Sequence, residues 1–295
     1  MASPFLKWAG GKGRLIPELL SRMPDKPNGG FRYIEPFIGG GAFFFYLEEN
    51  GWLKSSKISD INPELILCYK TIKLHVKMVI SELEMIAKNF PKRAATRERF
   101  FYKMRERWNR KLCTNIDDFN PKMASKRVAL TIFLNKTCFN GLFRVNSKGQ
   151  FNVPYGHYKN PNFVDINNLN EVSKALQGVE ITCKPYQEIE LDGEGIFVYF
   201  DPPYRPLTTS SSFTSYSKSG FNDSNQIELA EFVQSISSQA KVMLSNSDPK
   251  NTDAMDDFFD MLYSKFTIHR IQAPRSINSD GEKRGKISEI LVTNY

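Results

Sequence analysis

The chain has 295 residues, of which 41% are hydrophobic and 24% are charged, and its formal net charge is +8 at pH 7. These proportions suit a folded core in one large domain, or in one domain with an insertion. The apolar runs are too short to cross a membrane, and the first residues lack the apolar core of a signal peptide. We therefore expect a cytoplasmic protein without a membrane partner.

The cysteines and histidines argue against disulfides, metal sites and histidine-based chemistry. The four cysteines are widely spaced and form no Cys-x-x-Cys pair, which disfavours both disulfides and zinc. The three histidines are isolated from one another in the sequence. The sequence therefore predicts no metal site.

Positive charge is concentrated in one segment. Residues 92–148 hold 15 Lys and Arg against four Asp and Glu, a net charge of +11, which leaves the rest of the chain slightly acidic. A basic segment on a near-neutral scaffold favours a polyanionic partner such as nucleic acid. The alternative is an ordinary solvated helical surface.

Near the N-terminus, a glycine pair precedes a short predicted helix at residues 15–20. Gly10-Gly11-Lys12 superficially suggests a phosphate loop. A Walker motif, however, needs a glycine and a Ser or Thr at the positions that Leu6 and Gly13 occupy. The glycines would instead let the backbone approach a ligand closely.

Residues 32–47 predict a strand, a turn at Gly39-Gly40-Gly41 and a helix. This layout can hold a nucleotide-like cofactor at a helix N-terminus. A second predicted strand at residues 57–60 ends in Asp60, where a carboxylate commonly binds ribose hydroxyls. A tight strand–helix connection without a ligand is the alternative.

The middle of the chain is predicted to be helical. Apolar residues recur at helical spacing in residues 64–90, a long helix or a pair of helices, and further helices are predicted at residues 96–112 and 123–134. No strand pattern occurs in this span. We therefore expect a helical insertion in an α/β domain.

Residues 135–159 predict a β-hairpin or an extended loop, because Asn140-Gly141 and Lys148-Gly149 punctuate them. The segment is dense in amides and aromatics and contains Arg144. Such side chains can read base edges or fill the space left by an extruded base. An ordinary surface hairpin is the alternative, although it would expose Leu142 and Phe143.

The remainder alternates strands and helices. Strands are predicted at residues 179–183, 196–200, 241–245, 266–269 and 288–293, and a helix at residues 226–237. Between Pro206 and Asp223 lies a long Ser/Thr-rich loop, which we interpret as a lid.

The most informative stretch begins with the apolar run at residues 197–200, which leads directly into Asp201-Pro202-Pro203-Tyr204. The run predicts a strand buried on both faces, and the prolines end it at Asp201. Ligands bind at the carboxyl ends of strands in open α/β sheets. Asp201 and the Pro202 carbonyl could accept hydrogen bonds from an aromatic amine, and Tyr204 could stack on its ring. A solvated Asp in a strand–turn is the alternative.

Five stretches occur in a fixed order: Leu6–Lys12, Glu35–Gly41, Asp60–Asn62, Phe139–Arg144 and Asp201–Tyr204. Together they resemble the motifs of the Dam-type DNA adenine-N6 methyltransferases of group alpha. In that group the cofactor motif precedes a helical target-recognition insert, and the catalytic motif follows it. The resemblance runs from Pro4 to Tyr295. The ending, residues 284–295, is most similar to the GATC-specific restriction–modification methylases of the MboI and DpnII type.

The resemblance implies an α/β, Rossmann-like fold typical of S-adenosylmethionine-dependent methyltransferases, with a mixed sheet, a helical target-recognition insertion and a β-hairpin loop. It implies a catalytic, S-adenosylmethionine-binding domain at residues 1–62 and 160–295 and a helical DNA target-recognition domain at residues 63–159. The implied substrate is the adenine of GATC in double-stranded DNA, flipped out of the duplex. The resemblance also implies a restriction–modification role with a possible endonuclease that shares the site, and we expect a monomer in solution.

The same resemblance assigns site residues by position. The catalytic positions are Asp201, Pro202, Pro203 and Tyr204. The cofactor-binding positions are Trp8, Ala9, Gly10, Lys12, Glu35, Pro36, Phe37, Gly39, Gly40, Asp60, Ile61, Tyr186 and Asp201. The DNA-binding positions are Lys7, Phe139, Asn140, Leu142, Arg144, Asn152, Pro154 and Lys159. Phe139 departs from the tyrosine of the enterobacterial Dam enzymes, so a hydrogen bond from that position to phosphate is lost.

Three alternatives remain at this point. One is a methyltransferase for another exocyclic amine, on cytosine N4 or in RNA. The second is a catalytically silent DNA-binding protein, although such a protein should have lost Asp201 or the glycine turn. The third is a nucleotide hydrolase, against which the incomplete Walker pattern argues.

Overall fold

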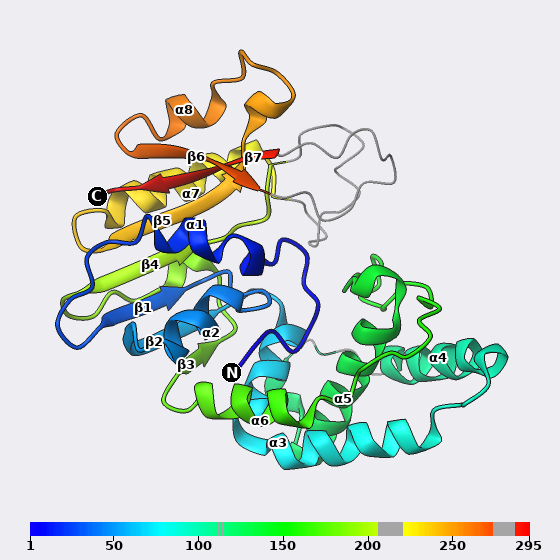
Figure 1. Cartoon of the computed structure of the whole chain (residues 1–295). Helices are drawn as coiled ribbons and strands as arrows, with labels where there is room; N and C mark the ends of the chain where they lie inside the picture. The colour runs from blue at the N-terminus through cyan, green and yellow to red at the C-terminus, as the bar shows by residue number, and fades with distance from the viewer. Residues whose placement is uncertain (111–112, 114, 206–220, 274–286) are drawn as a thin grey trace. The chain divides into compact units, whose positions relative to one another are not determined.

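The structure is a computed structural model that describes residues 1–110, 113, 115–205, 221–273 and 287–295. It divides into two compact units (Figure 1). The helical unit comprises Met1–Gly11, Ile38–Asn50 and Ser59–Cys183, and the sheet unit comprises Lys12–Phe37, Gly51–Ile58 and Lys184–Tyr295. Each is described by itself. The segment between Pro206 and Asp223, interpreted above as a lid, lies largely outside the described residues.

A mixed sheet of seven strands confirms the predicted fold class, in the order β3-β2-β1-β4-β5-β7-β6. The strands are β1 (Phe31–Glu35), β2 (Leu53–Ser59), β3 (Glu180–Thr182), β4 (Ile196–Phe200), β5 (Lys241–Ser247), β6 (Thr267–Ala273) and β7 (Ile287–Thr293). β1 runs parallel to β2 and β4, and β4 runs parallel to β5. β7 is antiparallel to both β5 and β6.

β4 occupies the centre of this sheet, and all five of its residues are buried. A central parallel strand needs apolar side chains on both faces, which Ile-Phe-Val-Tyr-Phe supplies. Pro202 and Pro203 follow at once and cannot extend the ladder. The predicted strand at residues 196–200 is therefore confirmed, and Asp201 stands at its carboxyl end.

Short helices complete the sheet unit: α1 (Ile16–Leu20), α7 (Asp223–Ile236) and α8 (Phe258–Leu262), with 3₁₀ turns η1 (Lys12–Arg14), η4 (Tyr186–Glu188) and η6 (Pro249–Asn251). α7 buries one apolar face, formed by Leu229, Val233 and Ile236, in the cluster that contains Val198 and Val242. Burial of such side chains contributes about 1.5–3 kcal/mol each. This packing fixes α7 against β4, which leads into the candidate catalytic motif.

The helical unit contains α2 (Ala42–Glu49), α3 (Pro63–Asn89), α4 (Ala94–Asn109), α5 (Pro121–Thr137) and α6 (Ile166–Ala175), together with β3 and the turns η2 (Ile116–Asp118) and η3 (Phe139–Gly141). α3 bends at His75, whose backbone is not helical (φ −138°, ψ 33°). Proline at the first position and an asparagine cap begin both α3 and α5. Twelve residues of α5 are buried, which makes it the central helix of this unit.

A buried ion pair joins α3 to α5. The Arg127 guanidinium binds both carboxylate oxygens of Glu64, and its Nε lies 3.0 Å from Oε2. The guanidinium also lies 3.5 Å from the ring centroid of Trp108 in α4. The pair is nearly inaccessible to solvent, with 5% of the Arg127 and 9% of the Glu64 side chain exposed. Three helices therefore meet at one desolvated charge pair.

The three long helices agree with the predicted ranges to within about three residues, but α6 and α8 were not predicted. α6 contains three asparagines, which are poor helix formers. It forms because Asp165 accepts a hydrogen bond from the Asn168 amide and because Leu169 and Val172 are buried. Among the described residues, no helix is both long and apolar enough to span a membrane.

Candidate functional site

The candidate catalytic motif, Asp201-Pro202-Pro203-Tyr204, lies where β4 ends, in the sheet unit. β1 is the parallel neighbour of β4, with Ile34 paired to Val198, so Glu35 ends the adjacent strand at the same edge. β1 and β4 flank the point where the strand order reverses, which is the ligand-binding position of open α/β sheets. The motif predicted from sequence therefore occupies the expected place.

Lys12 forms an ion pair with the Asp201 carboxylate. Its Nζ lies 2.6 Å from Asp201 Oδ1, and only 5% of the lysine side chain and 18% of the aspartate side chain are exposed. The same Nζ lies 4.6 Å from the ring centroid of Tyr204. The Tyr204 hydroxyl donates a hydrogen bond of 2.6 Å to Glu289 Oε2. Ammonium, carboxylate and aromatic ring are thus held together, and Glu289 was not predicted from sequence.

Burial controls the protonation of both carboxyl groups at this edge of the sheet. It raises the pKa of Asp201 to about 6, while the Lys12 ammonium acts in the opposite direction. Burial also raises the pKa of Glu35 well above its usual value, although a hydrogen bond from the Tyr33 hydroxyl opposes this. At neutral pH Asp201 is therefore ionised and can accept hydrogen bonds.

Two other candidate cofactor residues of the sheet unit, Phe37 and Tyr186, are aromatic. Phe37 and Tyr186 lie with their ring centroids 5.5 Å apart, and Tyr186 is 6% exposed. Pro36 is buried between Glu35 and Phe37. The rings offer an apolar contact for a planar group, while Glu35 and Asp201 offer acceptors.

In the helical unit, the glycine turn packs against Trp8. Gly39 has φ +46°, and a Cβ on it would lie 2.9 Å from Trp8 Cδ1. A Cβ on Gly40 would lie 3.3 Å from Trp8 Cβ. Neither position has room for a side chain without movement of the tryptophan. Ala9 and Gly10, which follow Trp8, are exposed.

Asp60 is linked to the same turn. Its carboxylate accepts hydrogen bonds from the amides of Gly39, at 3.3 Å, and Asn62, at 2.9 Å. Burial raises its pKa to about 6 even though these amides favour the charged form. Ile61 is 60% exposed beside it. Trp8, the glycine turn, Asp60 and Ile61 are thus brought together, as sequence reasoning expected.

The loop at residues 135–159 is also in the helical unit and is closed by antiparallel bridges between Cys138 and Tyr155 and between Val145 and Phe151. Asn135, which is fully buried, joins it to the N-terminal segment. Asn135 Nδ2 donates to the carbonyls of Lys7 and Gly141, and its Oδ1 accepts from the Lys7 amide at 2.7 Å. This amide was not among the predicted site residues.

The candidate DNA-reading side chains differ in their surroundings. Arg144 is exposed, and its Nε donates a hydrogen bond of 2.8 Å to Asn152 Oδ1. Lys7 Nζ lies 4.8 Å from the ring centroid of Tyr158. Phe139 is 52% exposed. Asn140, Pro154 and Lys159 are exposed and Leu142 is partly buried. Phe143 is instead a core residue, stacked on Trp8 with centroids 5.4 Å apart.

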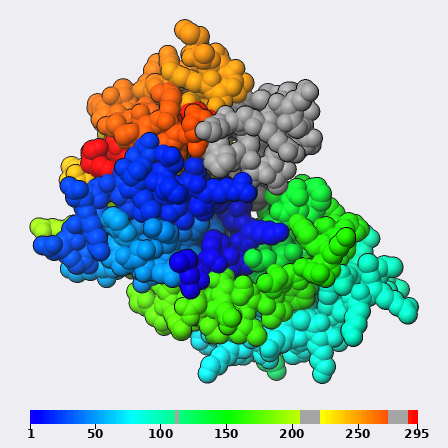
Figure 2. Space-filling view, in the orientation of Figure 1, coloured from blue at the N-terminus to red at the C-terminus, as the bar shows by residue number. Residues whose placement is uncertain are grey.

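One part of the basic segment is a solvent-facing helix. α4 exposes Arg99, Lys103 and Arg107, and Arg110 is exposed at its C-cap. In the space-filling view the teal atoms of α4 lie at the surface of the helical unit (Figure 2). The apolar side chains Phe101, Met104 and Trp108 face inward. Charge on one face and core on the other suits contact with a polyanion.

Comparison with known proteins agrees with these observations. The family model described as "D12 class N6 adenine-specific DNA methyltransferase" matches residues 8–277. The chain is 47% identical to a type II methyltransferase, M.MjaIII, of Methanocaldococcus jannaschii over 99% of both chains. It is 38% identical to the type II methyltransferase M1.LlaDCHI of Lactococcus lactis subsp. cremoris, over 99% of this chain and 95% of the other. It is 33% identical to a DNA adenine methylase of Haemophilus influenzae, over 98% and 92%.

Proposed function

The chain belongs to the D12 class of N6 adenine-specific DNA methyltransferases, and on this premise we propose that it methylates the adenine of GATC in double-stranded DNA with S-adenosylmethionine as donor. The observation that carries the proposal is the Asp201-Pro202-Pro203-Tyr204 motif at the end of the central strand, with Asp201 paired to Lys12. Two relatives are named type II methyltransferases. We therefore propose a role in a restriction–modification system of the MboI and DpnII type, as a cytoplasmic monomer.

The chemistry follows from the acceptor. The lone pair of the adenine amine is delocalised into the ring, so the amine is a weak nucleophile. Lys12 binds Oδ1 of Asp201, and we propose that Oδ2 and the Pro202 carbonyl accept the two amine hydrogens. This draws the nitrogen toward tetrahedral geometry and exposes its lone pair. Tyr204 stacks on the flipped base, whose extrusion costs a few kcal/mol.

S-Adenosylmethionine, when bound, supplies an electrophilic methyl group on its sulfonium sulfur. In the sheet unit we propose Lys12, Glu35, Pro36, Phe37, Tyr186 and Asp201 as its contacts. In the helical unit we propose Trp8, Ala9, Gly10, Gly39, Gly40, Asp60 and Ile61. The partly buried Asp60 carboxylate suits ribose hydroxyls, and the Phe37 and Tyr186 rings suit an adenine. These donor and acceptor types fit the nucleoside.

We propose that residues 63–159 form the DNA target-recognition domain and that the catalytic domain comprises residues 1–62 and 160–295. Exposed arginines and lysines of α4 would bind phosphates without regard to sequence. Lys7 and Arg144 would read base edges. Phe139, Asn140, Leu142, Asn152, Pro154 and Lys159 would complete the contact. The Arg144 Nε donates to Asn152, and within the described part of the chain its two terminal NH2 groups are available for the O6 and N7 of a guanine.

Replacing Arg144 by alanine should relax discrimination at one base of the site by about 1–3 kcal/mol. The bidentate contact to one guanine is lost, whereas phosphate contacts remain. The measurement is kcat/KM on GATC and on duplexes substituted at each position in turn. Arg99→Ala, which removes an exposed charge of α4, is the control and should weaken all duplexes equally. An unchanged preference in Arg144→Ala would remove this residue from the reading set.

The pH dependence should follow Asp201. The carboxylate is the active form and its pKa is about 6, so kcat/KM should fall about tenfold per pH unit below that value. Lys12 lowers this pKa, and its replacement by methionine should therefore shift the acid limb to higher pH. Lys57→Met is the control, because Lys57 forms an ion pair with Asp192, at 2.8 Å, and not with Asp201. An acid limb that stays in place in Lys12→Met would contradict the assignment.

The site proposal is tested by methyl transfer to a GATC duplex and to duplexes that carry each single-base substitution. Transfer confined to GATC supports the proposal. Equal transfer to a substituted duplex rejects GATC while it leaves the family and reaction unchanged.

A further inference from the structure

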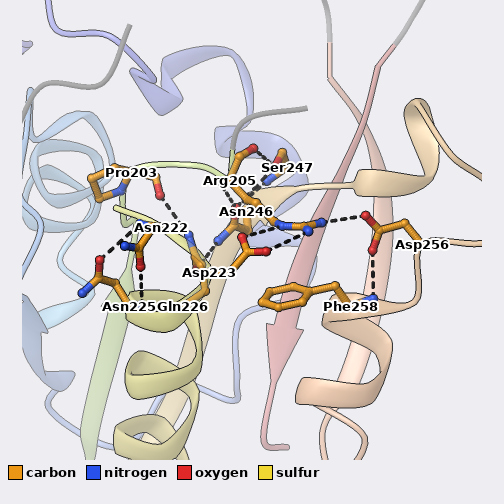
Figure 3. Close-up of polar contacts among 10 residues, drawn as sticks. All are labelled: Pro203, Arg205, Asn222, Asp223, Asn225, Gln226, Asn246, Ser247, Asp256 and Phe258. Atoms are coloured by element: carbon orange, nitrogen blue, oxygen red, sulfur yellow. Dashed lines mark hydrogen bonds and ion pairs between the residues drawn. The ribbon is translucent and has the colours of Figure 1, made fainter. Parts of the chain in front are cut away.

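Two fully buried amide side chains hold the backbone of the catalytic motif (Figure 3). Gln226 Nε2 donates a hydrogen bond of 3.1 Å to the carbonyl of Pro203. Asn246 Nδ2 donates to Gln226 Oε1 at 2.9 Å. Asn246 Oδ1 accepts from the backbone amide of Arg205 at 3.1 Å. The two amides thus form a chain between the backbone groups on either side of Tyr204.

Both amide side chains lie on regular elements of the sheet unit, Gln226 on α7 and Asn246 on β5. Gln226 lies in the first turn of α7, which Asn222 and Asn225 begin with a reciprocal capping box. Asn246 lies in β5, two residues beyond Leu244, which pairs with Phe200 of β4. It therefore reaches the level of Pro202. Neighbouring Ser247 adds a hydrogen bond of 2.8 Å from its hydroxyl to the Arg205 carbonyl.

The Arg205 side chain anchors the end of the motif a second time. Its guanidinium binds both carboxylate oxygens of Asp223, at 2.8 and 3.0 Å, and Oδ2 of Asp256 at 2.6 Å. It also lies 4.4 Å from the ring centroid of Phe258. A planar guanidinium held by two carboxylates and a ring has little freedom to turn. Both the backbone and the side chain of residue 205 are therefore fixed (Figure 3).

This anchoring determines where the Pro202 carbonyl points. The pyrrolidine rings fix φ at both prolines, so the peptide between them turns only with ψ of Pro202. Strand β4 holds the chain before Asp201, and the Gln226 hydrogen bond holds the Pro203 carbonyl. These two anchors lie on either side of the Pro202–Pro203 peptide and so restrict ψ of Pro202. Burial of polar amides costs free energy unless each group is paired. Apolar side chains could fill the same space without this cost. The hydrogen bonds of Gln226 and Asn246 to the motif backbone therefore favour a role in orienting it.

We propose that Gln226 and Asn246 are positioning residues for methyl transfer, which fix the Pro202 carbonyl and the Asp201 carboxylate in the geometry that accepts the adenine amine. The inference rests on the proposed function. Neither residue touches the reacting atoms. Because misplacement by about 1 Å can cost 10²-fold in rate, loss of the anchor should lower kcat without loss of cofactor affinity.

The main variant is Gln226→Met, which keeps the length of the side chain. The second variant is Ser247→Ala, a smaller change that should still fold if Gln226→Met does not. Asn294→Ala is the control. Asn294 also donates hydrogen bonds to backbone carbonyls of the sheet unit, those of Ser237 and Ala240, but these carbonyls lie outside the motif. The measurements are kcat and KM, the S-adenosylmethionine Kd, Tm, and amide exchange in the peptide that spans residues 201–205. Prolines carry no amide hydrogen, so that peptide reports chiefly on Tyr204 and Arg205.

We expect kcat to fall about 10- to 100-fold in Gln226→Met and about 3-fold in Ser247→Ala. The Kd should stay within about twofold, and exchange in residues 201–205 should be faster in both variants. Asn294→Ala should lower Tm and keep kcat. A kcat that stays near the wild-type value despite faster exchange, or an equal kcat loss in Asn294→Ala, would overturn the positioning role. A wild-type protein that transfers no methyl to adenine would reject the proposed function itself, whatever the variants do.

Discussion

Replacing Asp201 by asparagine should reduce methyl transfer by at least about 10³-fold while DNA and cofactor binding survive. The substitution keeps the shape of the side chain but removes the charge. An amide can also present its NH2 group to the amine, where an acceptor is needed. Alanine should abolish transfer as well, but it also removes the oxygen that accepts a hydrogen bond from the buried Lys12 ammonium, whereas the asparagine Oδ1 can still accept it. Asparagine is therefore the cleaner variant.

The measurement is single-turnover transfer from labelled S-adenosylmethionine, with DNA binding by fluorescence anisotropy and Tm alongside. Asp192→Asn is the matched control. Asp192 pairs with Lys57 in the same unit and is 71% exposed, so its loss should leave turnover unchanged. Near-normal turnover of Asp201→Asn would end the proposed mechanism. Loss of DNA binding in parallel would instead assign Asp201 a structural role.

Removing Arg127 should cost about 3–5 kcal/mol of unfolding free energy. Arg127→Met leaves the Glu64 carboxylate, 9% exposed, without its cation. It also removes the guanidinium that lies against Trp108. The double variant Glu64→Leu/Arg127→Met should recover most of this loss, because replacement of both partners by apolar residues removes the unpaired charge.

Urea unfolding of the whole chain measures this effect. Arg110→Met is the control, because the pair between Arg110 and Glu106 lies on the exposed surface of α4 with side chains 73% and 68% exposed. Its loss should cost no more than about 0.5 kcal/mol. A single Arg127→Met variant as stable as the control would show that the buried pair adds nothing to stability.

Local patterns made much of the fold predictable. The apolar run at residues 196–200 and the prolines after it determine both the central strand and its end. The glycines at 39 and 41 allow the positive φ angles of the turn before α2. Helical spacing locates α3, α4 and α5. These features depend on residues within a few positions of one another, so one sequence suffices to find them.

Features that depend on distant partners could not be predicted. Lys12 was expected to contact the cofactor, and the structure pairs it with Asp201, far along the chain. The Tyr204 contact with Glu289 and the Gln226–Asn246 chain likewise join separate elements. Strand β2 begins four residues before the predicted strand, because Lys54, Ser55 and Ser56 lack an apolar pattern and pairing with β1 decides their structure. Tertiary pairing outweighs local preference at each of these places.

The central claim is tested most directly by one transfer experiment. Labelled S-adenosylmethionine is incubated with the protein and a GATC duplex, the same duplex with the adenine replaced, or its single-stranded copy, and the labelled nucleoside is identified. We predict N6-methyladenine from the intact GATC duplex and no label in the duplex that lacks the adenine. Label in a different nucleoside, or none in the intact duplex although the protein binds S-adenosylmethionine, would contradict the account.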